Sequence, residues 1–266
     1  MEIHQVRIKY TSKKDVFKLY PLGDVHCGAV QCAEDAIKAK VKQIQEDPFA
    51  LWVGMGDQAD LIVPHDPRWD VMQIAPWVEQ TNIAESQRKW VVKLYEPIKD
   101  KCIGMCSGNH EDSIRIYNTQ DIHLDICRDL GVKNLGYSAF VRLFFARGKE
   151  VYAIDCHFEH GAGGAQTDGG KIMRLNIGMN AFDADIYAMG HLHDKKVNSI
   201  TRLHLTENFQ IKQKTRVGAI TGSWYKAYIE SPYPSYAEKK GYRPTELGCP
   251  VFYIYPNKRR VSVALE

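Results

Sequence analysis

The chain has 266 residues, of which 44% are hydrophobic and 25% are charged. These are ordinary globular proportions, and they exclude a disordered chain or a fibrous protein. No apolar run approaches the ~20 residues that a membrane-spanning helix needs, and residues 1–7 alternate polar and apolar side chains, so no secretory signal is expected. The net charge of +3 at pH 7 neither demands nor excludes a nucleic-acid partner.

The seven cysteines are an odd number and include no C-x-x-C pair. Most lie in apolar or helical stretches, where we expect them to be small buried hydrophobic residues. A disulfide framework would be unusual in so long a chain. The sequence therefore predicts a reducing compartment, and we expect a cytoplasmic protein that has no membrane partner.

The first half of the chain alternates short apolar runs with helical patterns. Strands are expected at 16–20, 50–53 and 101–105, and helices at 37–44, 83–98 and 122–130. Asp47-Pro48 is expected to end the first helix, and Gly131 the third.

Residues 61–80 lack a clear period and contain three prolines, so we expect a long loop near the site. Such loops often have a function, although many only cover the edge of a core. Whether this segment forms a lid is left open.

The second half is richer in strands. We expect strands at 140–145 and 151–154 around a turn at 147–149, a helix at 172–179, a strand at 185–189 and short strands from 197 to 263. Strands with crossover helices, followed mostly by strands, predict an α/β fold in which two sheets form a sandwich flanked by helices. We expect one domain over residues 1–266, with an insertion at about 61–80 and a strand-rich C-terminal part at about 197–266.

Side chains that bind metal ions follow five of the expected strands. The clusters are Gly23-Asp24-Val25-His26, Gly56-Asp57-Gln58-Ala59-Asp60, Gly108-Asn109-His110-Glu111, His160-Gly161 and Gly190-His191-Leu192-His193. Because ligands bind at the carboxyl ends of strands in α/β sheets, we expect these clusters to converge on one edge. The set contains carboxylates, imidazoles and an amide oxygen, which suits divalent ions such as Mn²⁺, Fe²⁺ or Zn²⁺.

The donors outnumber those that one ion needs. One ion with an open position for water takes three or four protein ligands. The candidate ligands are Asp24, His26, Asp57, Asn109, His160, His191 and His193. We therefore expect two divalent ions that share a carboxylate about 3.5–4 Å apart, with Mn²⁺ preferred over Fe²⁺ or Zn²⁺.

In this order, the five motifs resemble the calcineurin-like metallophosphoesterase family. The family pattern is D-x-H, G-D-x-x-D, G-N-H-[DE], a His before Gly, and G-H-x-H, and the matched span runs from Asp24 to His193. Beyond that span only a pattern of strands is recognisable. The resemblance implies the αββα fold of that family and a metal-dependent hydrolase that cleaves phosphate esters.

The resemblance also implies a role for each residue. The first metal would be held by Asp24, His26 and His193. The second would be held by Asn109, His160 and His191. Asp57 would bridge the two ions. His110 would face the substrate as general acid or transition-state stabiliser, and Asp60 would orient His110 and assist its charge.

Three features leave alternatives open. His157 lies three residues before His160; Gly161 favours His160 as the ligand, and His157 is expected to be a strand residue with an ordinary hydrogen bond. Glu111 is expected to favour the amino-terminal end of the following helix through its dipole. The aromatic and basic stretch 224–243 could stack bases and neutralise phosphates, although a tyrosine-rich loop packed on the sandwich is slightly favoured.

Departures from the family pattern bear on the substrate. Phosphoprotein phosphatases of this superfamily carry an Arg directly after the second Asp of G-D-x-x-D, where this chain has Leu61. Such an Arg contacts a dianionic monoester in bidentate fashion, so its absence argues against a phosphoprotein phosphatase and for diesters. The run Asp-Val-His-Cys-Gly resembles the nuclease and phosphodiesterase branches.

We therefore expect a two-metal-dependent phosphodiesterase that cleaves nucleic acid or nucleotides with a metal-bridging hydroxide. The alternative is a phosphomonoesterase or nucleotide pyrophosphatase that acts on a small substrate. A non-catalytic binding scaffold is least favoured, because every motif position is filled. The oligomeric state is left open.

Overall fold

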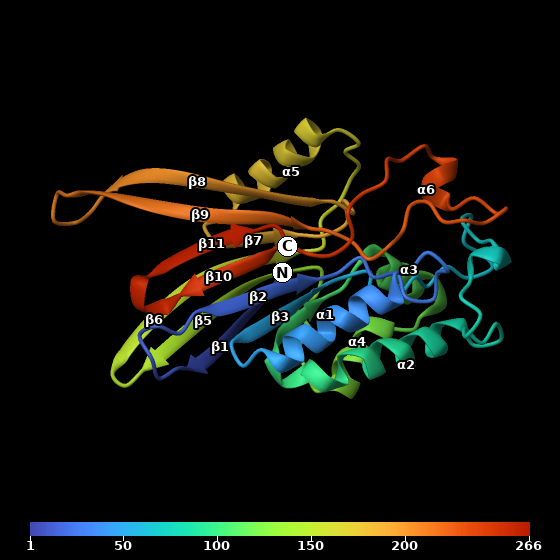
Figure 1. Cartoon of the computed structure of the whole chain (residues 1–266), viewed down its shortest axis with the longest axis horizontal. Helices are drawn as coiled ribbons and strands as arrows, with labels where there is room; N and C mark the ends of the chain where they lie inside the picture. The colour runs from blue at the N-terminus through green and yellow to red at the C-terminus, as the bar shows by residue number, and fades with distance from the viewer.

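The computed structural model describes residues 1–266 and contains two mixed β-sheets that pack face to face between helices (Figure 1). One sheet has six strands in the order β1-β5-β6-β7-β9-β8, and the other has five in the order β11-β10-β2-β3-β4. The predicted α/β sandwich with outer helices is confirmed.

The five-stranded sheet carries the first three motif clusters. Its strands are β2 (Phe17–Leu22), β3 (Ala50–Met55), β4 (Cys102–Cys106), β10 (Val251–Tyr255) and β11 (Arg260–Ala264). Strands β2, β3 and β4 run parallel, whereas β10 is antiparallel to β2 and to β11. The helices on this side are α1 (Glu34–Glu46), α2 (Ile83–Tyr95), α3 (Asn109–Asn118) and α4 (Ile122–Leu130).

Helices α1, α2 and α4 follow the expected periodicity, with one refinement. Ile37, Val41 and Ile44 form the buried face of α1, and Gly131 ends α4 as predicted, in a left-handed conformation. The helix expected to reach residue 98 ends at Tyr95 and continues as the 3-10 helix η2 (Glu96–Lys101), whose second residue is Pro97. A proline has no N–H to donate, so the α-helical pattern changes there.

The six-stranded sheet carries the other two motif clusters. Its strands are β1 (Glu2–Lys9), β5 (Ser138–Arg147), β6 (Glu150–Glu159), β7 (Ile186–Met189), β8 (Lys195–Leu205) and β9 (Ile211–Thr221). Helix α5 (Asp168–Ala181) packs on its outer face, and β8 and β9 form a long hairpin that projects beyond the sandwich (Figure 1). Strand β1, which the sequence did not predict, pairs in parallel with β5 at the edge of the sheet.

Alternating side chains build three apolar layers. In β2, Leu19 packs between the two sheets and Tyr20 packs under the helices of the five-stranded sheet. In β7, Ile186 and Ala188 face the space between the sheets, whereas Tyr187 packs toward α5. Both sheets are thus covered on two faces, which explains why their central strands are continuously apolar in sequence.

Two irregular segments lie at the same end of the molecule (Figure 1). Residues 61–80 contain only the short 3-10 helix η1 (Val71–Gln73), so this segment is the long loop that was expected. The second segment is residues 222–250, between β9 and β10, and it contains the four-residue helix α6 (Tyr236–Lys239). The two segments touch where Lys239 Nζ lies 3.4 Å from Asp70 Oδ2.

All seven cysteines are free thiols, and six of them are buried. Burial raises the pKa of these thiols, to about 12 for Cys249, so they are small apolar residues of the core as expected. None of the helices combines the length and the apolar composition that crossing a membrane would require.

Candidate metal centre

The strand ends bring the five motif clusters to one edge of the sandwich. The loops after β2 and β3 are joined by hydrogen bonds from Val25 N and His26 N to the Asp57 carbonyl, at 2.9 and 3.0 Å. The two sheets are joined where His191 N donates to Asp24 Oδ2 at 2.9 Å. His160 on the six-stranded sheet likewise donates from Nδ1 to the Met55 carbonyl at 2.8 Å.

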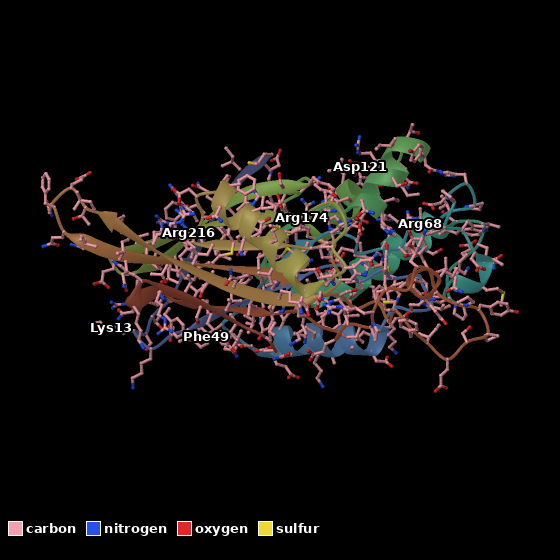
Figure 2. The ribbon with its side chains drawn as sticks, turned by 90° about the horizontal axis from the view of Figure 1, so that it is seen from above. Lys13, Phe49, Arg68, Asp121, Arg174 and Arg216 are labelled. Atoms are coloured by element: carbon pink, nitrogen blue, oxygen red, sulfur yellow. The ribbon has the colours of Figure 1, made fainter.

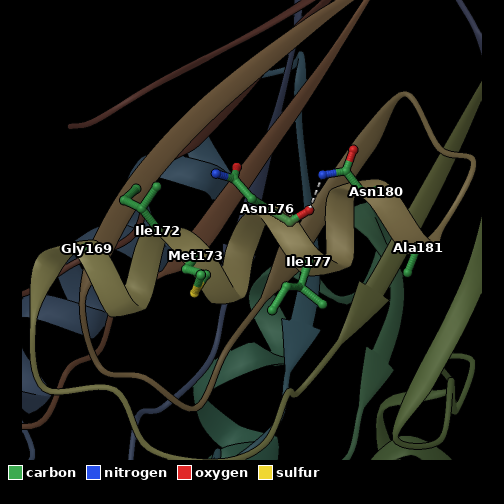
Figure 3. A pocket seen from close by; sticks show the side chains of 7 residues that line it. All are labelled: Gly169, Ile172, Met173, Asn176, Ile177, Asn180 and Ala181. Carbon is green, nitrogen blue, oxygen red and sulfur yellow. Dashed lines mark hydrogen bonds between the residues drawn. The ribbon is translucent and has the colours of Figure 1, made fainter.

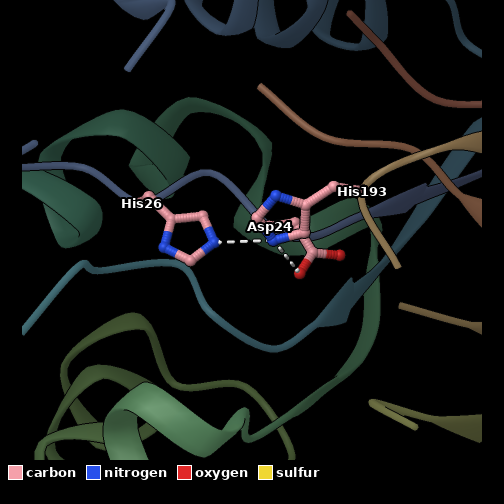
Figure 4. Close-up of side chains that lie close together, drawn as sticks. All are labelled: Asp24, His26 and His193. Atoms are coloured by element: carbon pink, nitrogen blue, oxygen red, sulfur yellow. Dashed lines mark hydrogen bonds and ion pairs between the residues drawn. The ribbon is translucent and has the colours of Figure 1, made fainter. Parts of the chain in front are cut away.

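Three donors form a first group, shown in Figure 4. His193 Nε2 lies 3.0 Å from His26 Nε2 and 3.3 Å from Asp24 Oδ1. His26 Nδ1 is 3.3 Å from Asp60 Oδ1, so Nδ1–H donates to the carboxylate and the lone pair of Nε2 is left free to bind a metal. Asp24 and His26 are buried, whereas the His193 side chain is 33% exposed.

A second group adjoins the first. Donor atoms of Asp57, His160 and His191 lie within 4.8 Å of one another. His160 Nε2 is 3.2 Å from Asp57 Oδ2 and 3.0 Å from Asn109 Oδ1. Because the Met55 carbonyl can only accept, Nδ1 of His160 carries the proton and Nε2 is again free to bind a metal.

Asp57 stands between the two groups. Its Oδ2 atom is 3.2 Å from His160 Nε2 in the second group and 4.0 Å from His26 Nε2 in the first. Its Oδ1 atom accepts the main-chain N–H of His110 at 3.0 Å. One carboxylate is therefore placed to face two ions while its other oxygen is held by the fold.

The donor spacing fits divalent ions. Metal–ligand bonds of about 2.1 Å at angles between 90° and 110° separate donor atoms by about 3.0–3.4 Å. The 3.0 and 3.3 Å separations in the first group, and 3.2 Å in the second, fall in that range. Two imidazole Nε2 atoms 3.0 Å apart can share a proton in an N–H···N hydrogen bond or bind one cation between their lone pairs.

The electrostatics of the site also favour cations. Burial disfavours the charged form of His160, but the charge of Asp57, with that of Asp24, outweighs burial and raises the pKa of His160 to about 10. Burial likewise opposes the ionisation of Asp57, yet His160 and His110 hold its pKa well below the ordinary value. Buried carboxylates thus attract positive charge here, and protons and metal ions compete for it.

The backbone is strained at the ligands themselves. Left-handed φ angles between 48° and 69° occur at five of the seven candidate ligands, namely Asp24, His26, Asp57, His191 and His193. Each such residue costs about 1–3 kcal/mol and needs a surrounding structure that holds it. Glycine is required beside them: a Cβ on Gly56 would lie 2.6 Å from His160 Nδ1 and 2.7 Å from the Gly108 backbone.

Glu111 braces the loop that carries Asp57. Its buried carboxylate accepts main-chain N–H groups of Asp57 at 3.0 Å, Gln58 at 2.7 Å and Gly108 at 2.9 Å. Burial and the Asp57 charge raise the pKa of Glu111, whereas the backbone donors oppose that rise. The expected helix-dipole role is therefore only part of its function, since Glu111 fixes a second loop. The G-N-H-[DE] pattern contained the signal for this residue.

His110 and Asp60 lie beside the first group. The Nδ1–H group of His110 donates a hydrogen bond to the Asp60 carbonyl, so Nε2 is the ring nitrogen on the side away from that carbonyl. The Asp60 carboxylate is nearer to His26, at 3.3 Å, than to His110 Nδ1, at 3.9 Å. Asp60 thus contacts both imidazoles, through its main chain for His110 and through its side chain for His26.

His157 and His160 lie in different environments. His157 is a strand residue of β6, as expected, but neither ring nitrogen has the ordinary hydrogen bond that was expected. Its ring stacks on Phe182 with centroids 3.7 Å apart, and burial lowers its pKa to about 4. His157 therefore belongs to the core, and His160 belongs to the donor cluster.

The stretch 224–243 contributes both to packing and to the rim. Trp224 is buried and donates its main-chain N–H to the Asp24 carbonyl at 3.0 Å. The ring centroid of Tyr225 lies 5.4 Å from that of His26 and 6.0 Å from that of His193. Four further tyrosines of the stretch are at least 40% exposed, namely Tyr228, Tyr233, Tyr236 and Tyr242.

One arginine of the site had no signal in the sequence. Arg68, from the loop 61–80, places Nη1 3.0 Å from His110 Nε2. Figure 2 shows Arg68 toward the end of the molecule opposite Lys13 and Arg216. No motif fixes its position in the loop, so the sequence alone did not connect it to His110.

One surface hollow lies away from the donor cluster. It measures about 740 Å³ and runs along the outer face of α5 (Figure 3). It is lined by Gly169, Ile172, Met173, Asn176, Ile177, Asn180 and Ala181. None of these residues is a candidate ligand, and a hollow along one helix has no converging polar groups, so the donor cluster is the better functional candidate.

Comparison with known proteins adds a distant likeness. No family model and no curated protein matches the chain. Among solved structures, the chain is similar to a conserved uncharacterised protein, a predicted phosphoesterase, from Streptococcus pneumoniae. The two share 12% sequence identity, the match covers 90% of this chain and 84% of that one, and the TM-score is 0.35. A likeness this distant leaves the residues of the site as the basis for inferring function.

The position of Asp57 predicts that both ions depend on it. Asp57→Asn should weaken the binding of each ion by roughly 10-fold or more, because a neutral amide bridges two cations poorly. Metal content after dialysis against Mn²⁺ measures this, with Asp155→Asn, at a half-buried aspartate of β6 that pairs with Arg142, as control. Two tightly held ions in the Asp57 variant would contradict the bridging role.

The hydrogen bonds that Glu111 accepts predict a large loss of stability when its carboxylate is replaced by an amide. Glu111→Gln should lower the free energy of unfolding by about 2–4 kcal/mol, because an amide NH₂ would then face main-chain N–H groups. Urea denaturation measures it, and Glu96→Gln, at an exposed glutamate paired with Lys99, is the matched control. Equal stability of the two variants would show that Glu111 is not an ionised acceptor.

Proposed function

We propose that this protein is a metal-dependent phosphodiesterase that hydrolyses phosphodiester bonds of nucleic acid or nucleotides. The observation that supports the proposal most is the convergence of five motif clusters into two adjoining donor groups with Asp57 between them. This convergence agrees with the family resemblance of the motifs. Mn²⁺ as the native ion and a cytoplasmic location are parts of the same proposal.

The residues divide the chemistry between binding and proton transfer. Two divalent ions, when bound, would lower the pKa of water and withdraw negative charge from phosphoryl oxygens. The first would be held by Asp24, His26 and His193, and the second by Asn109, His160 and His191, with Asp57 shared. Asp60 and the Met55 carbonyl fix the tautomers of His26 and His160, so their Nε2 lone pairs would be available to the ions.

His110 is placed to serve the leaving group. Its ring centroid lies 4.6 Å from that of His26, so it borders the first donor group. Its Nδ1–H donates to the Asp60 carbonyl, so in the doubly protonated imidazolium form Nε2–H would be the group that gives a proton to the departing oxygen. Its main-chain N–H to Asp57 Oδ1 couples its position to the bridging carboxylate.

Aromatic residues at the rim support a nucleotide-containing substrate. Tyr225 lies beside His26, and on the side of α3 the His65 and Tyr117 rings are 6.2 Å apart. Tyr117 is 71% exposed. Bases stack on such rings without regard to sequence, and each stack contributes about 1–3 kcal/mol.

A phosphomonoesterase is the second candidate, and Arg68 is the observation that favours it. A guanidinium interacts more strongly with a dianionic monoester than with a monoanionic diester. Leu61 therefore favours a diester less strongly, because another part of the chain supplies an arginine. A binding scaffold without chemistry is disfavoured, because every donor converges.

The deciding assay compares two aryl substrates. Metal-stripped protein is reconstituted with Mn²⁺, and hydrolysis of bis-p-nitrophenyl phosphate is compared with that of p-nitrophenyl phosphate, with Asp57→Asn as the blank. We expect faster diester hydrolysis that the blank lacks. Preference for the monoester would replace the proposal with the second candidate, and hydrolysis of neither would contradict both.

The proton-transfer role predicts a dependence on the leaving group. His110→Ala should retain its metals and lose about 10²–10⁴-fold in kcat on esters with poor leaving groups, and less on p-nitrophenyl esters. A series of leaving groups of increasing pKa measures the trend. The exposed His204→Ala is the control. An equal loss across the series would remove His110 from the acid role.

A further inference from the structure

Arg68 is directed into the candidate site by its own loop. The motif clusters do not include it, yet Nη1 is 3.0 Å from His110 Nε2. Its side chain is only 30% exposed, although the loop 61–80 that carries it runs over the surface. A guanidinium loses hydration when it is buried, so its position beside an imidazole requires a compensating partner.

Asp66 is that partner, and it binds one edge of the guanidinium. Arg68 donates from Nε to Asp66 Oδ1 at 3.0 Å and from Nη2 to Oδ2 at 2.8 Å. The Asp66 carboxylate is 10% exposed and also accepts the main-chain N–H of Arg68 at 2.8 Å. Burial opposes the charge of Arg68, but Asp66 outweighs burial and raises the pKa of the guanidinium.

The bidentate pair with Asp66 leaves Nη1 of the Arg68 guanidinium unpaired with a carboxylate. With Nε and Nη2 engaged by Asp66, Nη1 lies beside His110, and at most one of its two N–H groups can donate to the Nε2 lone pair of the neutral ring; a ring protonated at Nε2 accepts from neither. The second has no protein acceptor within hydrogen-bond distance. An oriented, permanently charged donor beside the atom that handles the leaving group is suited to an anionic oxygen.

We propose that Arg68 binds a non-bridging oxygen of the substrate phosphoryl group through Nη1, while Asp66 holds the opposite edge of the guanidinium. Arg68 is then a substrate-binding residue and Asp66 a positioning residue. The inference rests on the proposed function, because the donor groups must hold ions for a phosphoryl group to settle beside them. It deepens that function by assigning the phosphate contact to the loop 61–80.

The test measures binding of inorganic phosphate to Mn²⁺-loaded protein by calorimetry. Arg68→Gln should raise the dissociation constant about 10-fold or more, because it removes a charged donor from the anion. Arg68→Lys should recover part of the loss, since it restores charge without the fork. The control is Arg128→Gln, at an arginine of α4 that pairs with Asp125 at 2.8 Å and is 67% exposed.

The metal content of each variant is measured in parallel. Unchanged phosphate affinity in Arg68→Gln with metals retained overturns the inference, and so does a wild-type protein that takes up Mn²⁺ but no phosphate. Ester hydrolysis separates the two proposals. Phosphate binding that depends on Arg68 without hydrolysis overturns the proposed function alone, whereas hydrolysis with a KM indifferent to Arg68→Gln overturns this inference alone.

Discussion

The rest of the site depends on how Asp57 is held. Its carbonyl accepts the N–H groups of Val25 and His26, its own N–H donates to Glu111, and its Oδ1 accepts from His110. Main-chain bonds thus fix the carboxylate from three loops, and Oδ2 is left to face both donor groups. Because all of these partners are buried, the orientation of Oδ2 is set by folding and not by a ligand.

The same loops store strain that the sandwich must offset. Five ligands in left-handed conformations cost several kcal/mol together, at about 1–3 kcal/mol each. The compensation is local: Glu111 satisfies the loop after β3, and Asp24 Oδ2 accepts the N–H of His191 across the two sheets. Burying the carboxylates of Asp24 and Asp57 adds a further free-energy cost, because burial removes the water that solvates their charge. The candidate metal ligands therefore lie where the fold is least favourable by itself, and bound ions would relieve the repulsion.

Sequence periodicity was enough to predict the layers, and the motifs were enough to predict the ligands that converge. Three features were not predicted from the sequence, and each has a physical cause. Strand β1 shows only a short alternation at Val6 and Ile8, because an edge strand buries little. His157 was expected to hydrogen-bond, but aromatic stacking at 3.7 Å replaced polar contact, which no spacing reveals. Arg68 lies in an aperiodic loop, whose path depends on tertiary contacts.

That loop connects the phosphate contact to distant parts of the chain. A guanidinium placed by a motif would be as rigid as the strand beside it, whereas Arg68 depends on Asp66 and on what packs against residues 61–80. Gln73 in this loop bonds the Tyr233 carbonyl at 3.3 Å, and Asp70 contacts Lys239. The aromatic stretch 224–243 and the loop 61–80 therefore contact each other at the same edge of the sandwich. A substrate that stacks on the tyrosines would also stabilise the loop that holds its phosphate, so affinity for the base and affinity for the phosphoryl group would rise together.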